Sequence, residues 1–164
     1  MSRIGVAKAL LVAPLLLGAC LPYPHRANLT PLVHGQIRSD GIPAAGVRLR
    51  VALGDEDDLC GGRHSEVTTD ARGEFVVPPI RSYRLFLFVM AHRQFVWNLC
   101  VGAPEGWANI HESSGYTLVD TGPWWFSEVT CETTANRLLF AKCTEQQDLD
   151  PTEEKARRIL GKPE

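Results

Sequence analysis

Histidine and serine residues are the first candidates for chemistry in this chain. The segment His111-Glu112-Ser113-Ser114-Gly115 begins like the zinc-protease motif His-Glu-x-x-His. That motif needs a second histidine one helical turn further on, but position 115 is glycine and the segment is expected to be a loop. No base lies at a spacing that would activate Ser113 or Ser114, and no Gly-x-Ser-x-Gly elbow occurs. The sequence therefore predicts no catalytic residue.

The remaining metal-ligand types are scattered along the chain. His34, His64 and His92 fall on separate expected strands or turns and lack the spacing of zinc ligands. The acidic run at 55–58 offers carboxylates for calcium, but it lacks the hinge glycine and distal glutamate of calcium-binding loops. We expect no metal, no other cofactor and no enzymatic activity.

Tryptophan side chains offer more scope for binding. Trp107, Trp124 and Trp125 are expected outside the most regular strands. If Trp124 and Trp125 lie in one strand, they point to opposite faces, so one can enter the core while the other stays outside. Exposed indoles stack on sugar rings or fill partner pockets, whereas covered ones only add to the core. Both readings stay open, and these three residues are the candidate ligand-binding set.

The first 19 residues have the layout of a secretory signal. Arg3 and Lys8 give a basic start, the apolar run at 9–17 follows, and small residues precede Cys20. The apolar run is shorter than the ~20 residues that a membrane-spanning helix needs. We expect a signal helix over 1–19 that is removed by cleavage after Ala19.

The residues Leu17-Gly18-Ala19-Cys20 resemble the lipobox of bacterial lipoproteins. The resemblance implies that lipid is attached to the Cys20 thiol, so that the membrane itself is a partner. Leu21, in place of the aspartate that retains lipoproteins in the inner membrane, implies the outer membrane of the bacterial envelope, facing the periplasm.

The other four cysteines, Cys60, Cys100, Cys131 and Cys143, are expected to form disulfides. Four thiols in an exported chain indicate two disulfides in an oxidising compartment, with three pairings open. No Cys-x-x-Cys pair occurs, which removes the motif of zinc knuckles and of thioredoxin chemistry.

Charge excludes one class of partner. Of 17 basic and 19 acidic residues, the signal removes Arg3 and Lys8, which leaves 15 basic side chains against 19 acidic ones. Such a mildly acidic chain lacks the basic surface that nucleic-acid binding requires. Its length suits one domain.

Apolar and polar residues alternate in short runs separated by turn residues, which predicts an all-β fold of seven or more short strands. We expect a lipidated tether over 20–30, a β-sandwich domain over 31–145, and a tail over 146–164 with a short helix. A hairpin turn is expected at 91–93 and a long polar loop at 101–115. The expected strands are 32–38, 47–53, 65–69, 74–77, 83–90, 94–100, 116–119, 124–131 and 137–143, with the pair at 116–119 and 124–131 joined across 121–123.

Part of the chain, about residues 31–90, resembles the carboxypeptidase regulatory-like domain. The matching residues are Val33-x-Gly35-x-Ile37, Gly46-Val47-x-Leu49, Thr69-Asp70-Ala71-Arg72-Gly73-Glu74-Phe75, and Pro78-Pro79 before Tyr83-Arg84-Leu85. The resemblance implies a transthyretin-like (prealbumin-like, Ig-like) β-sandwich, which is usually non-catalytic. The related hydroxyisourate hydrolases end in Tyr-Arg-Gly-Ser, and this sequence ends differently.

Together these features predict a lipid-anchored protein of the cell envelope that acts as a non-catalytic binding or structural module. Its partner would be an envelope protein or a glycan. One alternative is a lipoprotein that binds glycan or peptidoglycan through exposed tryptophans. Another is a small periplasmic hydrolase, which would need a pocket with a paired nucleophile and base or a metal.

Overall fold

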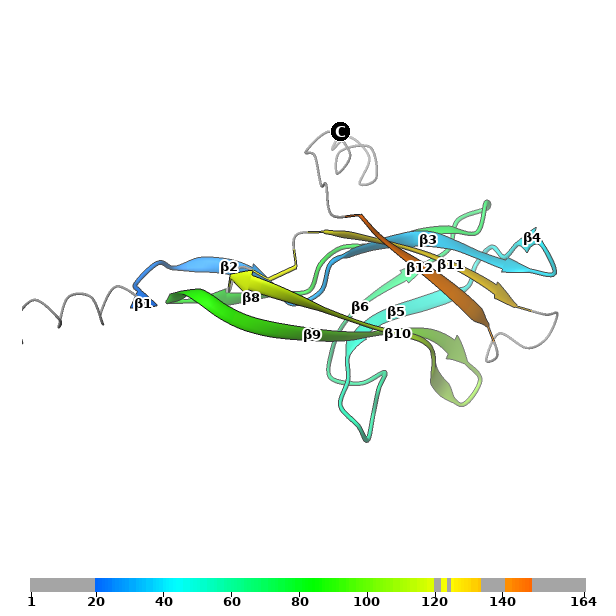
Figure 1. The fold of residues 1–164 in the computed structure, drawn as a ribbon. Coiled ribbons are helices and arrows are strands. Elements are labelled where there is room, and N and C mark those ends of the chain that lie inside the picture. The colour runs from blue at the N-terminus through cyan, green and yellow to red at the C-terminus, as the bar shows by residue number, and fades with distance from the viewer. Residues whose placement is uncertain (1–19, 120–121, 124, 134–140, 149–164) are drawn as a thin grey trace, which may run out of the picture.

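A computed structural model of the protein describes residues 20–119, 122–123, 125–133 and 141–148. Every regular element in these residues is a β-strand, as expected for an all-β chain (Figure 1). None of these residues belongs to a helix with the length and apolar character to cross a membrane. The expected signal helix and the helix of the tail lie outside the described residues. The strands are β1 (Cys20–Leu21), β2 (His25–Asn28), β3 (Leu32–Ser39), β4 (Ile42–Pro43), β5 (Arg48–Leu53), β6 (Arg63–Thr68), β7 (Glu74–Val77), β8 (Arg81–Arg84), β9 (Leu87–Ala103), β10 (Gly106–Val119), β11 (Phe126–Thr133) and β12 (Lys142–Asp148).

The first sheet is built around β9, its longest strand. Strand β10 pairs antiparallel with β9 along one side. On the other side, β5 pairs with the final third of β9, and β6 pairs with β5. Strand β1 pairs with the start of β9. Side chains of β9 alternate, so that Phe95, Trp97, Leu99 and Val101 are buried on one face.

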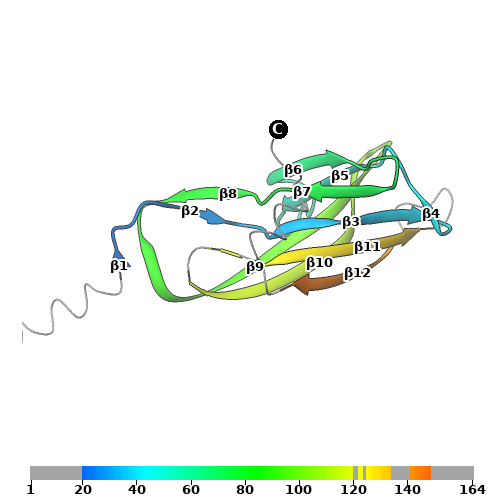
Figure 2. The ribbon, with the colours of Figure 1, turned by 90° about the horizontal axis from the view of Figure 1, so that it is seen from above.

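The second sheet is mixed and is built around β3. Strands β7 and β4 pair antiparallel with β3, while β11 pairs with it in parallel from Leu32↔Phe126 to Ser39↔Thr133. Strand β12 then pairs antiparallel with β11 at the edge. A third, two-stranded sheet of β2 and β8 lies beside β1 at the end of the molecule opposite β4 (Figures 1 and 2).

One hydrophobic core joins the inner faces of the two large sheets. Each fully buried aliphatic or aromatic side chain in it contributes roughly 1.5–3 kcal/mol to folding. The core side chains are Leu49, Val51, Trp97, Leu99 and Val101 from the first sheet and Val33, Ile37, Phe75, Val77, Val129 and Cys131 from the second.

The early strands match the sequence-based expectations, and the middle of the chain does not. Residues 91–93 form no hairpin turn, because β9 runs unbroken through them. The expected loop 101–115 is the end of β9, a turn at 104–105 and most of β10. Strand 116–119 does not pair across 121–123 with the strand that follows, since β10 pairs with β9 and β11 pairs with β3 and β12.

The ends of the domain also differ from expectation. Residues 20–30 form no loose tether: β1 and β2 both join sheets, and Ala27 is fully buried. At the other end, residues 137–140 of the expected strand 137–143 lie outside the described residues, and β12 continues to Asp148, into the expected tail. The described strands therefore begin at Cys20 and end at Asp148.

Candidate functional site

A cluster of polar side chains occupies the seam where β10 of the first sheet meets β12 of the second. Glu145 of β12 is at its centre, and its side chain is only 12% exposed. His111 Nε2 lies 3.1 Å from Glu145 Oε2, and Ser127 Oγ donates to Oε1 at 2.8 Å. Ser113 also donates a hydrogen bond to this carboxylate. Three strands are thus tied to one carboxylate.

The pKa of Glu145 reflects two opposing effects. Burial raises the pKa of this carboxyl, but hydrogen bonds from His111, Ser113 and Ser127 outweigh burial and hold the pKa below its ordinary value. The ionised carboxylate is therefore the form that the fold favours.

The same contacts define what this cluster can do chemically. Ser127 donates to the carboxylate and not to His111, whereas a serine nucleophile needs a hydrogen bond to its base. The ring of His111 also packs edge-on against Trp97, with centroids 5.8 Å apart. This arrangement clamps the two sheets together. The sequence analysis considered His111 only for a zinc motif that it rejected, and Ser113 only as a nucleophile without a base, so it missed this role.

Trp107 lies on the outer face of the first sheet, stacked against two arginines of β5. The guanidinium carbons of Arg48 and Arg50 lie 5.0 and 4.1 Å from its ring centroid. Gly102 of β9 lies between Arg48 and Trp107, and a Cβ there would sit 3.2 Å from Arg48 Cβ and 3.8 Å from the indole. The glycine lets the indole lie across β9, and the ring is half-buried.

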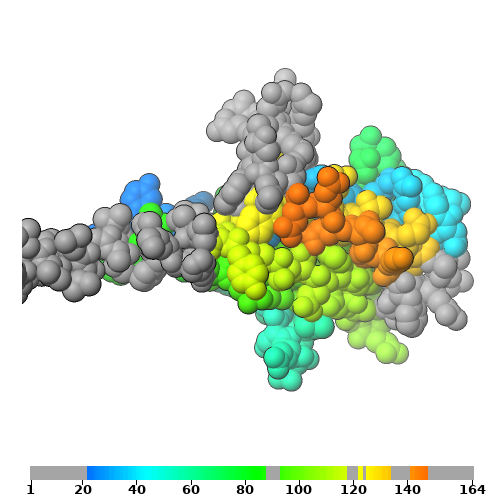
Figure 3. Space-filling view, in the orientation of Figure 1, coloured from blue at the N-terminus to red at the C-terminus, as the bar shows by residue number. Residues whose placement is uncertain are grey.

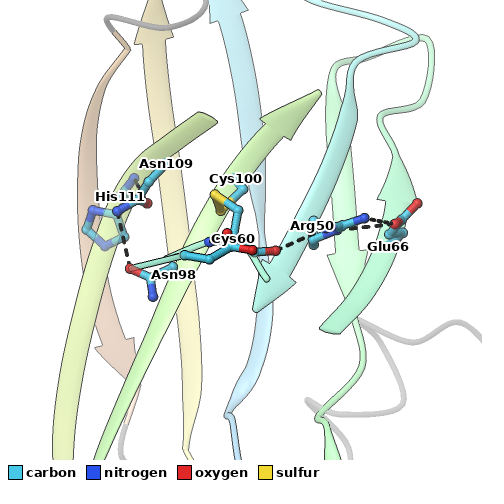
Figure 4. Close-up of a disulfide and its surroundings, with 8 residues drawn as sticks. Arg50, Cys60, Glu66, Asn98, Cys100, Asn109 and His111 are labelled. Carbon is cyan, nitrogen blue, oxygen red and sulfur yellow. Dashed lines mark hydrogen bonds and ion pairs between the residues drawn. A yellow bond between two sulfur atoms is a disulfide. The ribbon is translucent and has the colours of Figure 1, made fainter. Parts of the chain in front are cut away.

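Arg50 also contacts Glu66 of β6 and Cys60, at the end of the loop between β5 and β6 (Figure 4). Its guanidinium contacts the Glu66 carboxylate at 2.6 Å and donates to the Cys60 carbonyl at 3.0 Å. The hydrogen bond from Arg50 lowers the pKa of Glu66, which is exposed to solvent. In the same sheet, Asn109 Nδ2 donates to Asn98 Oδ1 at 3.2 Å. This bond gives a partner to the side-chain oxygen of Asn98, a residue that is 1% exposed.

The expectation of two disulfides is confirmed, and the pairing that the sequence left open is resolved. Cys60 pairs with Cys100, and Cys131 pairs with Cys143. The first bond fastens the loop between β5 and β6 onto the outer face of β9, which covers Cys100 completely. The loop's acidic residues at 55–58 are exposed, and the loop projects from the body (Figure 3).

The outer face of the second sheet carries an open trough of about 420 Å³. Its lining mixes basic, acidic and neutral polar groups from three adjacent strands, which suits a polar ligand more than an apolar one. The lining side chains include His34, Gln36 and Arg38 of β3, Glu74 of β7, and Glu128 and Thr130 of β11.

The other predicted site residues are not brought together. Trp125 is 5% exposed, and its ring meets Phe95 edge-on at 6.3 Å, so its indole belongs to the core. Trp124, the side chain of His92 and the side chain of Cys20 lie outside what the structure describes. Within the described residues, no three His, Cys, Asp or Glu side chains are grouped closely enough to hold a metal.

Comparisons with known proteins give no family for this chain. No protein-family model matches it, and no curated protein and no solved structure is similar to it.

Proposed function

We propose that this protein is a lipid-anchored component of a bacterial cell envelope that serves as a non-catalytic binding or structural module. The observation that carries the proposal is the lipobox-like sequence at 17–20, after a charged start and an apolar run. Its cysteine is the first residue of β1, so the residue to which the anchor would be attached is itself part of a sheet. Two disulfides support an oxidising compartment. Leu21 favours the outer membrane.

We infer that the two sheets form a transthyretin-like sandwich related to the carboxypeptidase regulatory-like domain. The matched segment 69–75 supports this, because its polar residues organise one corner of the fold. Thr69 Oγ1 accepts from the Val47 amide and donates to the Ala44 carbonyl. Asp70 Oδ1 accepts from the backbone amides of residues 72 and 74.

The trough on the second sheet is the surface we assign to a polar ligand. Among the described residues, a glycan bound by side-chain hydrogen bonds is favoured over one stacked on indoles, because Trp107 already stacks on two arginines and Trp125 is buried. A partner protein with a polar surface would suit the same trough. A hydrolase would need a nucleophile beside a base, and the seam cluster directs Ser127 to the Glu145 carboxylate instead.

Metabolic labelling with radioactive palmitate tests the anchor. Expressed in a Gram-negative host, the natural chain should incorporate label and sediment with membranes, and Cys20→Ala should do neither. The control is Cys60→Ala/Cys100→Ala, which removes two other cysteines and should keep the label. An unlabelled natural chain, or a labelled Cys20→Ala chain, would refute the proposal.

Calorimetric titration with soluble peptidoglycan fragments tests the ligand surface. We expect Arg38→Ala and Glu128→Gln to weaken binding and Trp107→Phe to leave it unchanged. Loss of binding in Trp107→Phe alone would instead support recognition through the indole. If no fragment releases or absorbs heat, the glycan is excluded as the ligand and a partner protein remains the candidate. Crosslinking in intact envelopes would then identify that partner.

A further inference from the structure

The end of the molecule that carries Cys20 has an unusual surface. Strands β1, β2 and β8 and the start of β9 lie together there, away from the shared core (Figures 1 and 2). Backbone pairing holds Cys20 opposite Phe88 and Leu21 opposite Leu87. Paired strands lie about 4.8 Å apart, so a group attached to Cys20 is held close to this surface and is not separated from it by a flexible linker.

Large apolar side chains gather at this end. The described residues contain eight large apolar side chains that are exposed, and four of them are here. Tyr23, Tyr83, Leu85 and Phe86 are 60%, 65%, 58% and 48% exposed. Two are tyrosines, whose rings combine an apolar body with a polar tip and therefore suit the boundary between lipid and water.

The charge of the same end is opposite to that of the rest of the protein. Segments 20–31 and 78–93 contain four arginines, at 26, 81, 84 and 93, and no aspartate or glutamate. The rest of the chain after the signal keeps 11 of the 15 basic residues and all 19 acidic ones. Arg26 and Arg81 are exposed. Basic side chains beside a bilayer are attracted to anionic headgroups.

We propose that this end is a membrane seat: Tyr23, Tyr83, Leu85 and Phe86 enter the headgroup region of the bilayer, and Arg26 and Arg81 meet lipid phosphates. The inference rests on the proposed anchor at Cys20 and adds an orientation to it. Acyl chains alone would let the domain tumble above the membrane, whereas the seat holds the two large sheets outward, with β4 farthest from the lipid. The trough on the second sheet then stays open to solvent.

Hydroxyl-radical footprinting of the full lipid-anchored chain in vesicles tests the seat. The vesicles contain phosphatidylethanolamine and phosphatidylglycerol, and oxidation is read by mass spectrometry. Tyr116 on β10 is an internal control, since it is 69% exposed and pairs with Gln94, seven residues along β9 from the start of that strand at Leu87. We expect Tyr23 and Tyr83 to be oxidised severalfold more slowly than Tyr116. Equal rates at all three tyrosines would overturn the proposal.

Flotation of the vesicles separates failure of the seat from failure of the anchor. A natural chain that does not float has no working anchor, and the seat then falls with it. A chain that floats but shows no protection at Tyr23 and Tyr83 keeps the anchor and loses the seat. As a second measurement, Leu85→Ser/Phe86→Ser should raise the oxidation rate of Tyr83 toward that of Tyr116, and Ile42→Ser, at the opposite end, should not. Protection that is unchanged by Leu85→Ser/Phe86→Ser would also refute the seat.

Discussion

Removing the Cys60–Cys100 disulfide should destabilise the protein more than removing the other one. The bond closes a loop with a sequence separation of 40 residues, whereas Cys131 and Cys143 are separated by 12. A cross-link stabilises mainly by reducing the entropy of the unfolded chain, and the effect grows with the logarithm of loop length. This model gives about 4 kcal/mol for the longer loop and about 3 kcal/mol for the shorter one.

The two bonds differ further in what they hold in the folded state. Cys131 and Cys143 already face each other across β11 and β12, whose backbone pairing persists without the bond. Cys60 lies in a loop, and the bond is a main link between that loop and β9. Loss of the first bond should therefore also loosen the cover over Cys100, which adds to the entropic difference.

The assay is equilibrium unfolding in guanidinium chloride without reductant, followed by tryptophan fluorescence. Trp97, 1% exposed in the core, reports unfolding. We compare the natural chain with Cys60→Ala/Cys100→Ala and with Cys131→Ala/Cys143→Ala, so that two sulfurs are lost each time. The free energy of unfolding should fall by about 4 and about 3 kcal/mol respectively. An equal or larger loss in the second variant would refute the reasoning.

Three further predictions concern single side chains. Glu145→Gln should lower stability at neutral pH by about 1–3 kcal/mol, because the hydrogen bonds that converge on the carboxylate are weakened. In the natural chain, the lowered pKa of Glu145 means that this stability is present above the ordinary glutamate pKa and is lost as pH falls through the folded-state pKa. The stability of Glu145→Gln should therefore depend less on acid pH. Thermal melts across pH measure this difference. Gly115→Ala should cost about 1–3 kcal/mol in chemical unfolding, because the new Cβ would lie 2.6 Å from the indole of Trp125. Arg50→Met should cost about 1–2 kcal/mol in the same assay, while Arg48→Met, whose side chain is 66% exposed, should cost no more than about 0.5 kcal/mol.

Controls decide each of these outcomes. Ser114→Ala, next to the glycine and exposed, should leave the unfolding midpoint nearly unchanged. An acid dependence that is the same in the natural chain and in Glu145→Gln would mean that other carboxylates govern acid unfolding. Equal losses in the two arginine variants would contradict the role given to the Cys60 carbonyl and to Glu66.

Sequence patterns predicted the strands whose inner faces are apolar. Strands β3, β5 and β7 each carry two core side chains on one face, such as Leu49 and Val51 in β5, and their expected bounds lie within a residue of those observed. The presence of two disulfides was also predictable, because four cysteines follow a segment with the layout of a secretory signal.

Strand β10 escaped prediction because its inner face is polar or small. The register places His111, Ser113 and Gly115 opposite the core residues Leu99, Trp97 and Phe95. His111 and Ser113 can lie on the inner face because both hydrogen-bond to Glu145 of β12. Gly115 is needed because the indole of Trp125 packs against it. No local pattern reveals partners that arrive from later strands, so the segment looked like a loop.

Strand β9 was divided wrongly for a related reason. Ala91, His92 and Arg93 break the apolar run at its centre, which is typical of a turn. In the fold this point lies between the part of β9 that pairs with β1 and the part that pairs with β5. The strand that pairs with β9 changes along its length only in the assembled sheet. The residues at 91–93 therefore cannot show by themselves that the strand continues through them.

The parallel pairing of β3 with β11 has a consequence for how the chain reaches its native state. Leu32 meets Phe126, so the middle strand of the second sheet lacks a neighbour on one side until most of the polypeptide has been synthesised. Closing so long a segment is slow compared with forming a hairpin. We expect the emerging chain to stay unfolded until its last third is present. This delay would suit the export proposed above, because an unfolded chain is thinner than the folded domain.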